Sequence, residues 1–211
     1  MQNFDQWNPN PKDLKGWWER FWSDRQVPFG GPSRNLLPVI SAEILSRKGA
    51  TLSAVDIGSG NGRYAIPMAE LGCSVTALEW TKSGADRVQE MSNNKSVHVD
   101  IDRVDYTEAC LDHREYDLVV CSGLLEEIDS ADHINAITGF ARWTSRGGLA
   151  VIKYCLELEG RGQLVDAGLT ESVLRDQGMH IVSVREEKTM KTSAATKMGI
   201  RTGTVIARQP G

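Results

Sequence analysis

Three alternating glycines separate a strand-length apolar run from a helical stretch near residue 60. The run at residues 53–58 leads directly into the turn Gly58-Ser59-Gly60-Asn61-Gly62. Glycine has no Cβ and tolerates positive φ, so a turn of this composition lets a ligand approach the backbone closely. Each glycine also lowers stability unless the chain needs that freedom. The sequence therefore predicts a ligand-binding turn at the carboxyl end of a strand.

Strand-length apolar runs alternate with helical stretches from residue 52 onward. The runs lie at residues 53–58, 74–79, 96–101, 116–122 and 149–155, and helices are expected at 62–71, 82–91, 131–144 and 168–176. Continuous apolar strands separated by helices indicate a parallel sheet covered on both faces. Two more runs, 180–187 and 202–209, follow each other without a helix and predict an antiparallel hairpin with a long tip at 188–201. The predicted fold class is therefore α/β, with a Rossmann-like seven-stranded sheet that is mostly parallel, ends in an antiparallel hairpin and carries helices on both faces.

The N-terminal segment is rich in aromatic residues. A short helix is expected at 12–24, ended by the proline- and glycine-rich turn at 28–32, and a second helix at 33–47 with Ser33 as N-cap. We expect a single domain over 1–211, in which 1–50 form a helical lid or extension and 52–211 the α/β core. A helix packed against the mouth of such a core also covers its pocket. The residues expected to contact substrate are Trp18, Trp22 and Phe29.

An acidic residue ends the second apolar run. Glu79 lies where Rossmann-like folds place the carboxylate that accepts the ribose hydroxyls of a nucleotide. The dinucleotide fingerprint would need Gly or Ala at position 63, where this chain has the much larger Arg63. The glycine turn and Glu79 together therefore predict a nucleoside site, with NAD as the weaker candidate.

These motifs resemble those of a known enzyme family. Residues 56–62 resemble the D/E-x-G-x-G-x-G signature of class I S-adenosylmethionine-dependent methyltransferases, and Glu79 matches their ribose-binding acid. The likeness extends over about 52–155: residues 116–120 resemble the family's fourth strand, and 145–149 the turn into the fifth, where Arg146 replaces the usual proline. Residues 22–32 are similar to the tellurite-resistance and thiopurine methyltransferase branch.

The resemblance implies S-adenosylmethionine as cofactor and assigns its contacts. Asp56 would steady the glycine turn and the methionine ammonium, and an acid after the third strand, either Asp102 or Asp105, would take the adenine amino group. The segment after the fourth strand would pass beside the reacting methyl. The cofactor-binding residues expected in this way are Asp56, Gly58, Ser59, Gly60, Gly62, Glu79, Trp80, Asp102, Asp105, Ser122, Gly123 and Leu124.

The expected reaction is methyl transfer to a small-molecule acceptor. A hydroxyl or ammonium acceptor needs a general base, whereas a thiolate, ring nitrogen or inorganic anion does not. Candidate bases are Glu126, Glu127 and Tyr154, although the two glutamates also suit the helix start that follows them. The sequence leaves open the acceptor atom, and whether the same cofactor instead serves ring closure or transfer of its aminobutyrate arm, or a regulator without chemistry.

Composition and charge argue against several classes of binding partner. A net charge of −4 has the wrong sign for attraction to phosphate backbones, so no nucleic acid is expected. No stretch approaches the ~20 apolar residues of a membrane span, and the first residues lack the pattern of a signal peptide, so a cytoplasmic location is expected. The cysteines and histidines show no ligand spacing, so no metal site is predicted. The oligomeric state is not readable from the sequence.

Overall fold

A computed structural model describes residues 13–24, 31–47, 49–106, 114–160, 162–192 and 197–211. The helices are α1 (Leu14–Ser23), α2 (Leu37–Ser46), α3 (Ala65–Glu70), α4 (Lys82–Lys95), α6 (His133–Trp143) and α7 (Leu169–Asp176), with two 3-10 turns, η3 (Leu125–Glu127) and η4 (Ser130–Asp132). The strands are β1 (Ser53–Ile57), β2 (Ser74–Leu78), β3 (Asp100–Asp102), β4 (Tyr116–Ser122), β5 (Thr144–Leu158), β6 (Gly162–Gln163), β7 (His180–Thr192) and β8 (Lys197–Arg208).

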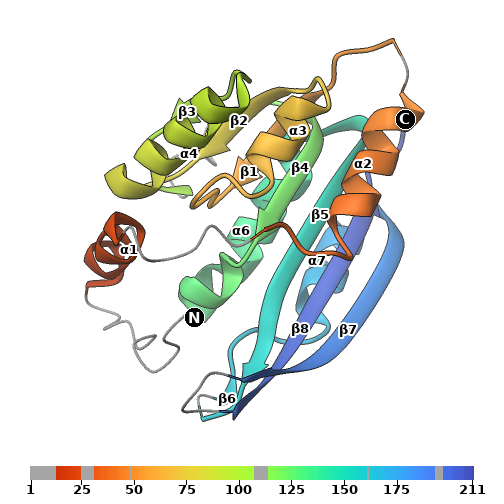
Figure 1. The fold of residues 1–211 in the computed structure, drawn as a ribbon. Coiled ribbons are helices and arrows are strands. Elements are labelled where there is room, and N and C mark those ends of the chain that lie inside the picture. Colours follow the sequence, from red (N-terminus) through yellow and green to blue (C-terminus); the bar gives the residue numbers. More distant parts are fainter. Residues whose placement is uncertain (1–12, 25–30, 48, 107–113, 161, 193–196) are drawn as a thin grey trace.

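The strands form one mixed sheet in the order β3-β2-β1-β4-β5-β8-β7 (Figure 1). The first five of these pair in parallel, and β8 runs antiparallel to both β5 and β7. The short strand β6, which was not expected, pairs with the end of β5. The predicted fold class is confirmed, including the C-terminal antiparallel pair.

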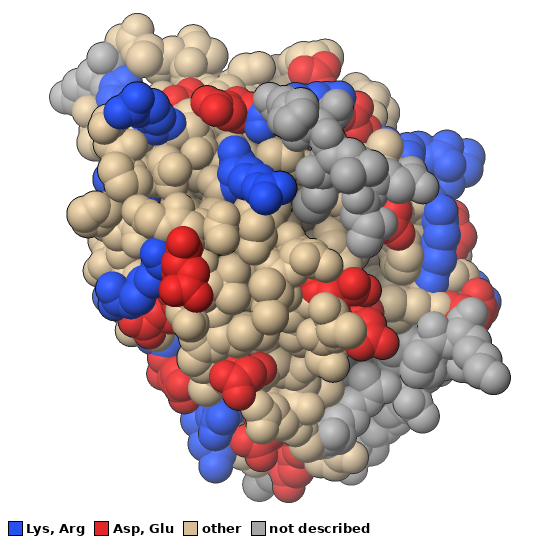
Figure 2. All heavy atoms as spheres, turned by 180° about the vertical axis from the view of Figure 1, so that it is seen from behind, with Lys and Arg blue, Asp and Glu red and all other residues tan. Residues whose placement is uncertain are grey.

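Helices cover both faces of the sheet because neighbouring strand residues point to opposite sides. Ala54 belongs to an apolar cluster with α2, α3 and α4, which lie in front of the sheet in Figure 1. Val55, the next residue, belongs to a second cluster with α6 and α7 behind the sheet. On the far side of the molecule, Figure 2 shows Lys and Arg side chains scattered among Asp and Glu side chains.

Several predicted boundaries were wrong. The third strand was expected at 96–101, but α4 continues to Lys95 and ends in the left-handed cap Ser96, so β3 begins only at Asp100. Ser33 is not the N-cap of α2; its carbonyl closes a turn with the N–H groups of residues 36 and 37. Much of the expected hairpin tip is paired strand, since β7 and β8 continue to residues 192 and 197. The polar residues there suit an edge ribbon open to water, and residues 193–196 lie outside the described part of the chain.

The two helices of the N-terminal segment differ in their packing. Leu36, Ile40 and Ile44, in and beside α2, are buried in the core cluster of the front face. Helix α1 contains no buried residue and contacts α4. By packing, α2 therefore belongs to the core, whereas α1 is the part of 1–50 that suits the expected lid. None of the helices in the described ranges has the length and apolar character needed to cross a membrane.

Candidate active site

The glycine turn lies at the carboxyl end of β1 and is fastened to the end of β2. Gly58, Gly60 and Gly62 have φ values of 68°, 57° and 77°, a region in which other residues are strained. The N–H groups of Gly58 and Ser59 both donate to the Leu78 carbonyl at 3.0 Å. The sequence uses glycine here because the chain must turn sharply beside a neighbouring strand.

Asp56 is buried directly beneath this turn. Its Oδ2 accepts the Ala65 N–H at 2.9 Å, which ties β1 to the first residue of α3. Burial raises the pKa of Asp56 to about 7, and the negative charge of Glu79 adds to the rise, while the Ala65 N–H and the Arg63 charge oppose it. A buried carboxyl of this kind gains from a cation placed nearby.

Glu79 forms a preorganised corner between the glycine turn and α4. Its Oε2 accepts the Gly60 N–H at 2.8 Å, and its Oε1 accepts the Thr81 N–H at 2.9 Å and the Thr81 hydroxyl at 2.5 Å. Burial raises the pKa of Glu79, and these donors act against that rise. The carboxylate is thus held in one orientation at the edge of a pocket.

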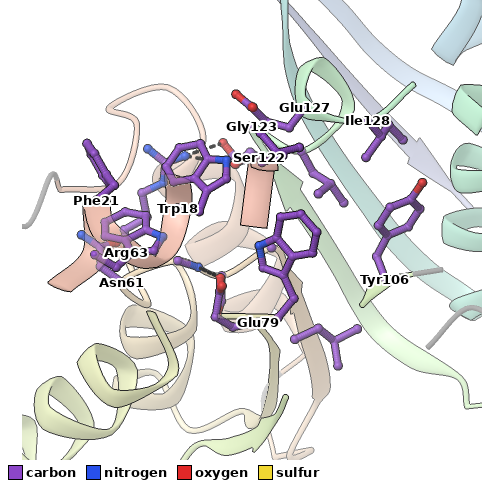
Figure 3. A pocket seen from close by; sticks show the side chains of 18 of the residues that line it. Trp18, Phe21, Asn61, Arg63, Glu79, Tyr106, Ser122, Gly123, Glu127 and Ile128 are labelled. Atoms are coloured by element: carbon purple, nitrogen blue, oxygen red, sulfur yellow. Dashed lines mark hydrogen bonds between the residues drawn. The ribbon is translucent and has the colours of Figure 1, made fainter. Parts of the chain in front are cut away.

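The pocket extends from Glu79 to the segment that follows β4, and Figure 3 shows its side chains. The lining residues expected from the sequence are Trp18, Trp22, Gly58, Ser59, Gly60, Glu79, Trp80, Ser122, Gly123, Leu124 and Glu127. The lining residues missed by the sequence analysis are Leu14, Phe21, Asn61, Arg63, Leu78, Val104, Tyr106 and Ile128. Phe29, also expected at the substrate, lies outside the described residues.

Neither acid considered for adenine lines the pocket. β3 ends at Asp102, whose carboxylate lies 2.7 Å from the Arg114 guanidinium in an ion pair. Beyond it, Val104 and Tyr106 face the pocket while Asp105, between them, does not. Contact of either acid with adenine stays a prediction, and Val104 and Tyr106 are the described residues of this segment that line the pocket. Gly62 also faces elsewhere, since a Cβ on it would meet Ile66 at 3.2 Å.

The three candidate bases occupy different environments. Glu127 lines the pocket. Glu126 is turned toward β5, where the Cys155 N–H lowers its pKa, but burial raises the pKa more strongly, and its Oε2 is buried without a hydrogen-bond partner among the described residues. Tyr154 does not reach the pocket: strand alternation places it with Ile152 in the cluster under α6 and α7.

Arg63 connects the glycine turn to the end of β4. Its Nη2 donates to the Ser122 carbonyl at 3.0 Å and approaches the Ser122 hydroxyl at 3.4 Å. The sequence analysis used this residue only as an argument against a dinucleotide. Its position directly after the third glycine is the signal that it borders the same site, and it brings a positive charge to the pocket wall.

The aromatic face of α1 forms another wall. The Trp18 and Trp22 rings are stacked with centroids 5.7 Å apart. Trp22 lies so close to the glycine turn that a Cβ on Gly60 would be 2.6 Å from its Cζ2 atom. Within the described residues, no group of three His, Cys, Asp or Glu side chains is placed to hold a metal ion.

Part of the chain is similar to known methyltransferases. Residues 54–148 match a family described as "Methyltransferase domain". A ubiquinone biosynthesis O-methyltransferase from Rickettsia akari (strain Hartford) is 24% identical over 105 residues, which are 48% of this chain and 39% of that protein. The chain therefore spans about two fifths of the length of this curated relative.

Solved structures share the fold at low identity. The magnesium protoporphyrin IX methyltransferase ChlM from Synechocystis PCC 6803, crystallised with bound S-adenosylmethionine, has a TM-score of 0.67 and 14% identity, with 93% of this chain and 97% of that chain covered. TehB from Haemophilus influenzae has a TM-score of 0.71 and 15% identity, with 91% and 67% covered. These structures show that the chain has the Rossmann-like fold of S-adenosylmethionine-dependent methyltransferases. The family match spans residues 54–148, the segment that contains the glycine turn and Glu79.

The pocket fits this cofactor. The glycine turn leaves its backbone open and Glu79 presents a fixed carboxylate of the kind that accepts two ribose hydroxyls, whereas Asp56, which was also expected at the cofactor, is buried beneath the turn and does not line the pocket. The Ser59 hydroxyl, which borders the pocket, is buried with no hydrogen-bond partner in the part of the chain that the structure describes. A polar ligand that fills the pocket would satisfy this hydroxyl.

Proposed function

We propose that this chain transfers the methyl group of S-adenosylmethionine to a small-molecule acceptor. The observation that carries the proposal is that one pocket joins the Glu79 corner to a second region containing Arg63, Ser122 and Glu127. Apolar and aromatic walls with a few polar groups are typical of small-molecule sites.

Methyl transfer requires mainly that the protein hold the acceptor and the cofactor in the correct relative position. The cofactor supplies a methyl group on a sulfonium, which is open to in-line attack. The chain contributes by holding an acceptor in line with that methyl and by excluding water. The rings of Trp18 and Phe21 on α1 supply the dry wall, so we propose α1 as a lid over the site.

We assign contact with the acceptor to Glu127. Among the three candidate bases it alone lines the pocket, and a carboxylate there can take the proton of a hydroxyl or ammonium acceptor. Glu126 serves the packing of η3 against β5, and Tyr154 serves the core. The Arg63 guanidinium, on the other side of Ser122, favours an acceptor that carries negative charge.

The product formed from the cofactor tests the proposal. The purified chain is incubated with S-adenosylmethionine and a panel of phenols, amines, thiols, carboxylic acids and oxyanions, and nucleoside products are separated by chromatography. S-adenosylhomocysteine formed only with an acceptor supports methyl transfer. Methylthioadenosine would instead support ring closure or transfer of the aminobutyrate arm. Tight cofactor binding without any turnover would support a regulator.

Once an acceptor is known, Glu127→Gln tests the base. For a hydroxyl or ammonium acceptor, kcat should fall by about 10² to 10⁴, while cofactor affinity is unchanged. The matched control is Glu126→Gln, which removes the neighbouring carboxylate and should retain most of the activity. If the control loses activity and Glu127→Gln does not, the assignment of the two residues is reversed.

A further inference from the structure

Helix α1 is held on α4 by contacts at the N-terminus of α4 and at the C-terminus of α1. The Glu19 carboxylate accepts the Lys82 N–H at 2.8 Å and the Ser83 N–H at 2.9 Å, and the Ser83 hydroxyl donates back to the Glu19 carbonyl at 2.7 Å. The first N–H groups of a helix have no partner within it and carry partial positive charge. Glu19 therefore caps α4 from a different helix, while Thr81, its own N-cap, accepts the Gly84 N–H.

The C-terminal end of α1 is held by an arginine of α4. Arg87 Nε donates to the Trp22 carbonyl at 2.5 Å, and its Nη2 donates to the Asp24 carbonyl. These carbonyls belong to the last turn and the C-cap of α1, where a cation is favourable. The guanidinium also lies 5.9 Å from the centroid of the Trp22 ring. Arg87 is only 3% exposed, so this contact is well defined.

These polar contacts determine where α1 lies. No residue of α1 is buried, so apolar packing alone fixes its position weakly. Glu19 and Arg87, together called the α1–α4 clamp, each bind the terminal turn of the other helix: Glu19 binds the start of α4, and Arg87 binds the end of α1. With α1 held in this way, Trp22 lies against Gly60 and Trp18 lines the pocket.

The clamp is continuous with the ribose corner. Gly60 N–H and Thr81 donate to Glu79, Thr81 caps α4, and the N–H groups that follow in α4 donate to Glu19. A ligand that binds Glu79 therefore joins the hydrogen-bond network that includes Thr81, the N-cap of α4. Glu19 and Glu79 are close enough for the negative charge of Glu19 to raise the pKa of Glu79.

We propose that Glu19 and Arg87 are positioning residues that couple docking of α1 to occupation of the ribose site. Hydroxyl donors from a ribose spread the charge of Glu79 and so relieve its repulsion of Glu19. Docked α1, in turn, holds Trp22 against the glycine turn and slows escape of the cofactor. Such coupling is reciprocal, so the factor by which the ligand favours docking equals the factor by which docking tightens the ligand.

This inference requires binding of the cofactor and not the proposed methyl transfer. The probe is S-adenosylhomocysteine, whose affinity is measured by calorimetry and whose dissociation rate is measured by tryptophan fluorescence. Docking of α1 is measured separately as hydrogen exchange of the amides of residues 14–23. No acceptor is present, so failure to find an acceptor leaves the experiment intact.

The test variants are Glu19→Gln and Arg87→Lys, which keep side-chain size or charge and remove part of the clamp. We expect each to weaken S-adenosylhomocysteine about tenfold, within the usual range for coupled sites, through faster dissociation. In the unchanged chain the ligand should slow exchange of residues 14–23 by a similar factor, and this protection should be lost in both variants. The control is Asp86→Asn, which removes a negative charge from the exposed side of α4, where it pairs with Lys82, and should change neither quantity.

Three results would overturn the proposal. One is unchanged ligand affinity in both variants. Another is exchange of residues 14–23 in the unchanged chain that does not respond to the ligand. The third is weakened binding in Asp86→Asn equal to that in Glu19→Gln, because charge near α4, rather than the clamp, would then explain the effect. Since α1 has no buried residue, Glu19→Gln should leave thermal unfolding unchanged, and a folded variant is available for every measurement.

Discussion

Asp56→Asn offers a direct test of the buried charge at the glycine turn. The pKa of Asp56 is raised from 3.8 to about 7, chiefly by burial. One pKa unit corresponds to about 1.4 kcal/mol, so this rise amounts to about 4 kcal/mol of preference for the neutral form in the folded chain. Asparagine has nearly the same shape, stays neutral at every pH and can still accept the Ala65 N–H.

The raised pKa of Asp56 makes the free energy of unfolding depend on pH. Because the folded pKa lies above the unfolded value, the contribution of Asp56 is most favourable below pH 3.8 and is lost as pH rises through 7. We therefore expect Asp56→Asn to be more stable than the unchanged chain at pH 8, by up to about 4 kcal/mol. The difference should shrink steadily toward pH 4, where both side chains are neutral.

Cofactor binding should respond in the opposite direction. Asp56 does not line the pocket, so its charge would act on a ligand across the glycine turn. We expect an ionised Asp56 to favour the ammonium of S-adenosylhomocysteine, so the affinity of the unchanged chain should fall as pH drops below 7, and Asp56→Asn should bind more weakly with little pH dependence. Urea unfolding and calorimetry between pH 5 and 8 give both quantities. The contributions of other titrating groups cancel when the unchanged chain and Asp56→Asn are compared at the same pH. A stability difference that is the same at pH 5 and pH 8 would refute the reasoning.

Three further changes test other parts of the site. Glu79→Gln should weaken S-adenosylhomocysteine by roughly 2 to 3 kcal/mol, the scale of hydrogen bonds to charged groups, and unchanged affinity by calorimetry would remove Glu79 from the ribose site. Gly60→Ala should weaken the ligand and raise hydrogen exchange in α1, because φ is 57° and the new Cβ would meet Trp22 at 2.6 Å; normal binding would contradict the glycine argument. A chain beginning at Ser33 should stay folded by circular dichroism and keep some affinity but lose most turnover, whereas aggregation would show that α1 is part of the core.

The parts of the fold that were predicted correctly depend on local pattern. Continuous apolar runs identified β1, β2 and β4 because both faces of a central parallel strand are covered. β3 escaped this pattern, since Asp100 and Asp102 on an edge strand are polar and the preceding helix continues to Lys95. Helix ends of this kind depend on a left-handed cap at Ser96, which is not a glycine and gives no signal in the sequence.

The parts of the site that consist of residues close together in the sequence could be predicted. The glycine turn and the acid at the end of β2 are each encoded by neighbouring residues, and the structure places both at the pocket. Tyr154 was misplaced because a strand residue near the carboxyl end can point to either face, and only the register with β4 and β8 decides which. Tyr106 and Glu19 gave no signal, since their contacts involve residues distant in the sequence.

The order of the strands explains how the chemistry is divided among the segments. β1 lies between β2 and β4, so the connection after β1 leads to one side of the sheet and later connections lead to the other. A crevice forms at such a point, beyond the carboxyl ends of the strands.

The β1 and β2 ends supply the glycine turn and Glu79, which we propose bind the parts of S-adenosylmethionine that do not change with the acceptor. Across the crevice, the segment after β4 supplies Ser122 and Glu127, and α1 supplies the aromatic wall. Choice of acceptor therefore belongs to these two segments, and substitutions there should change which acceptor is methylated while leaving the affinity for S-adenosylhomocysteine nearly constant.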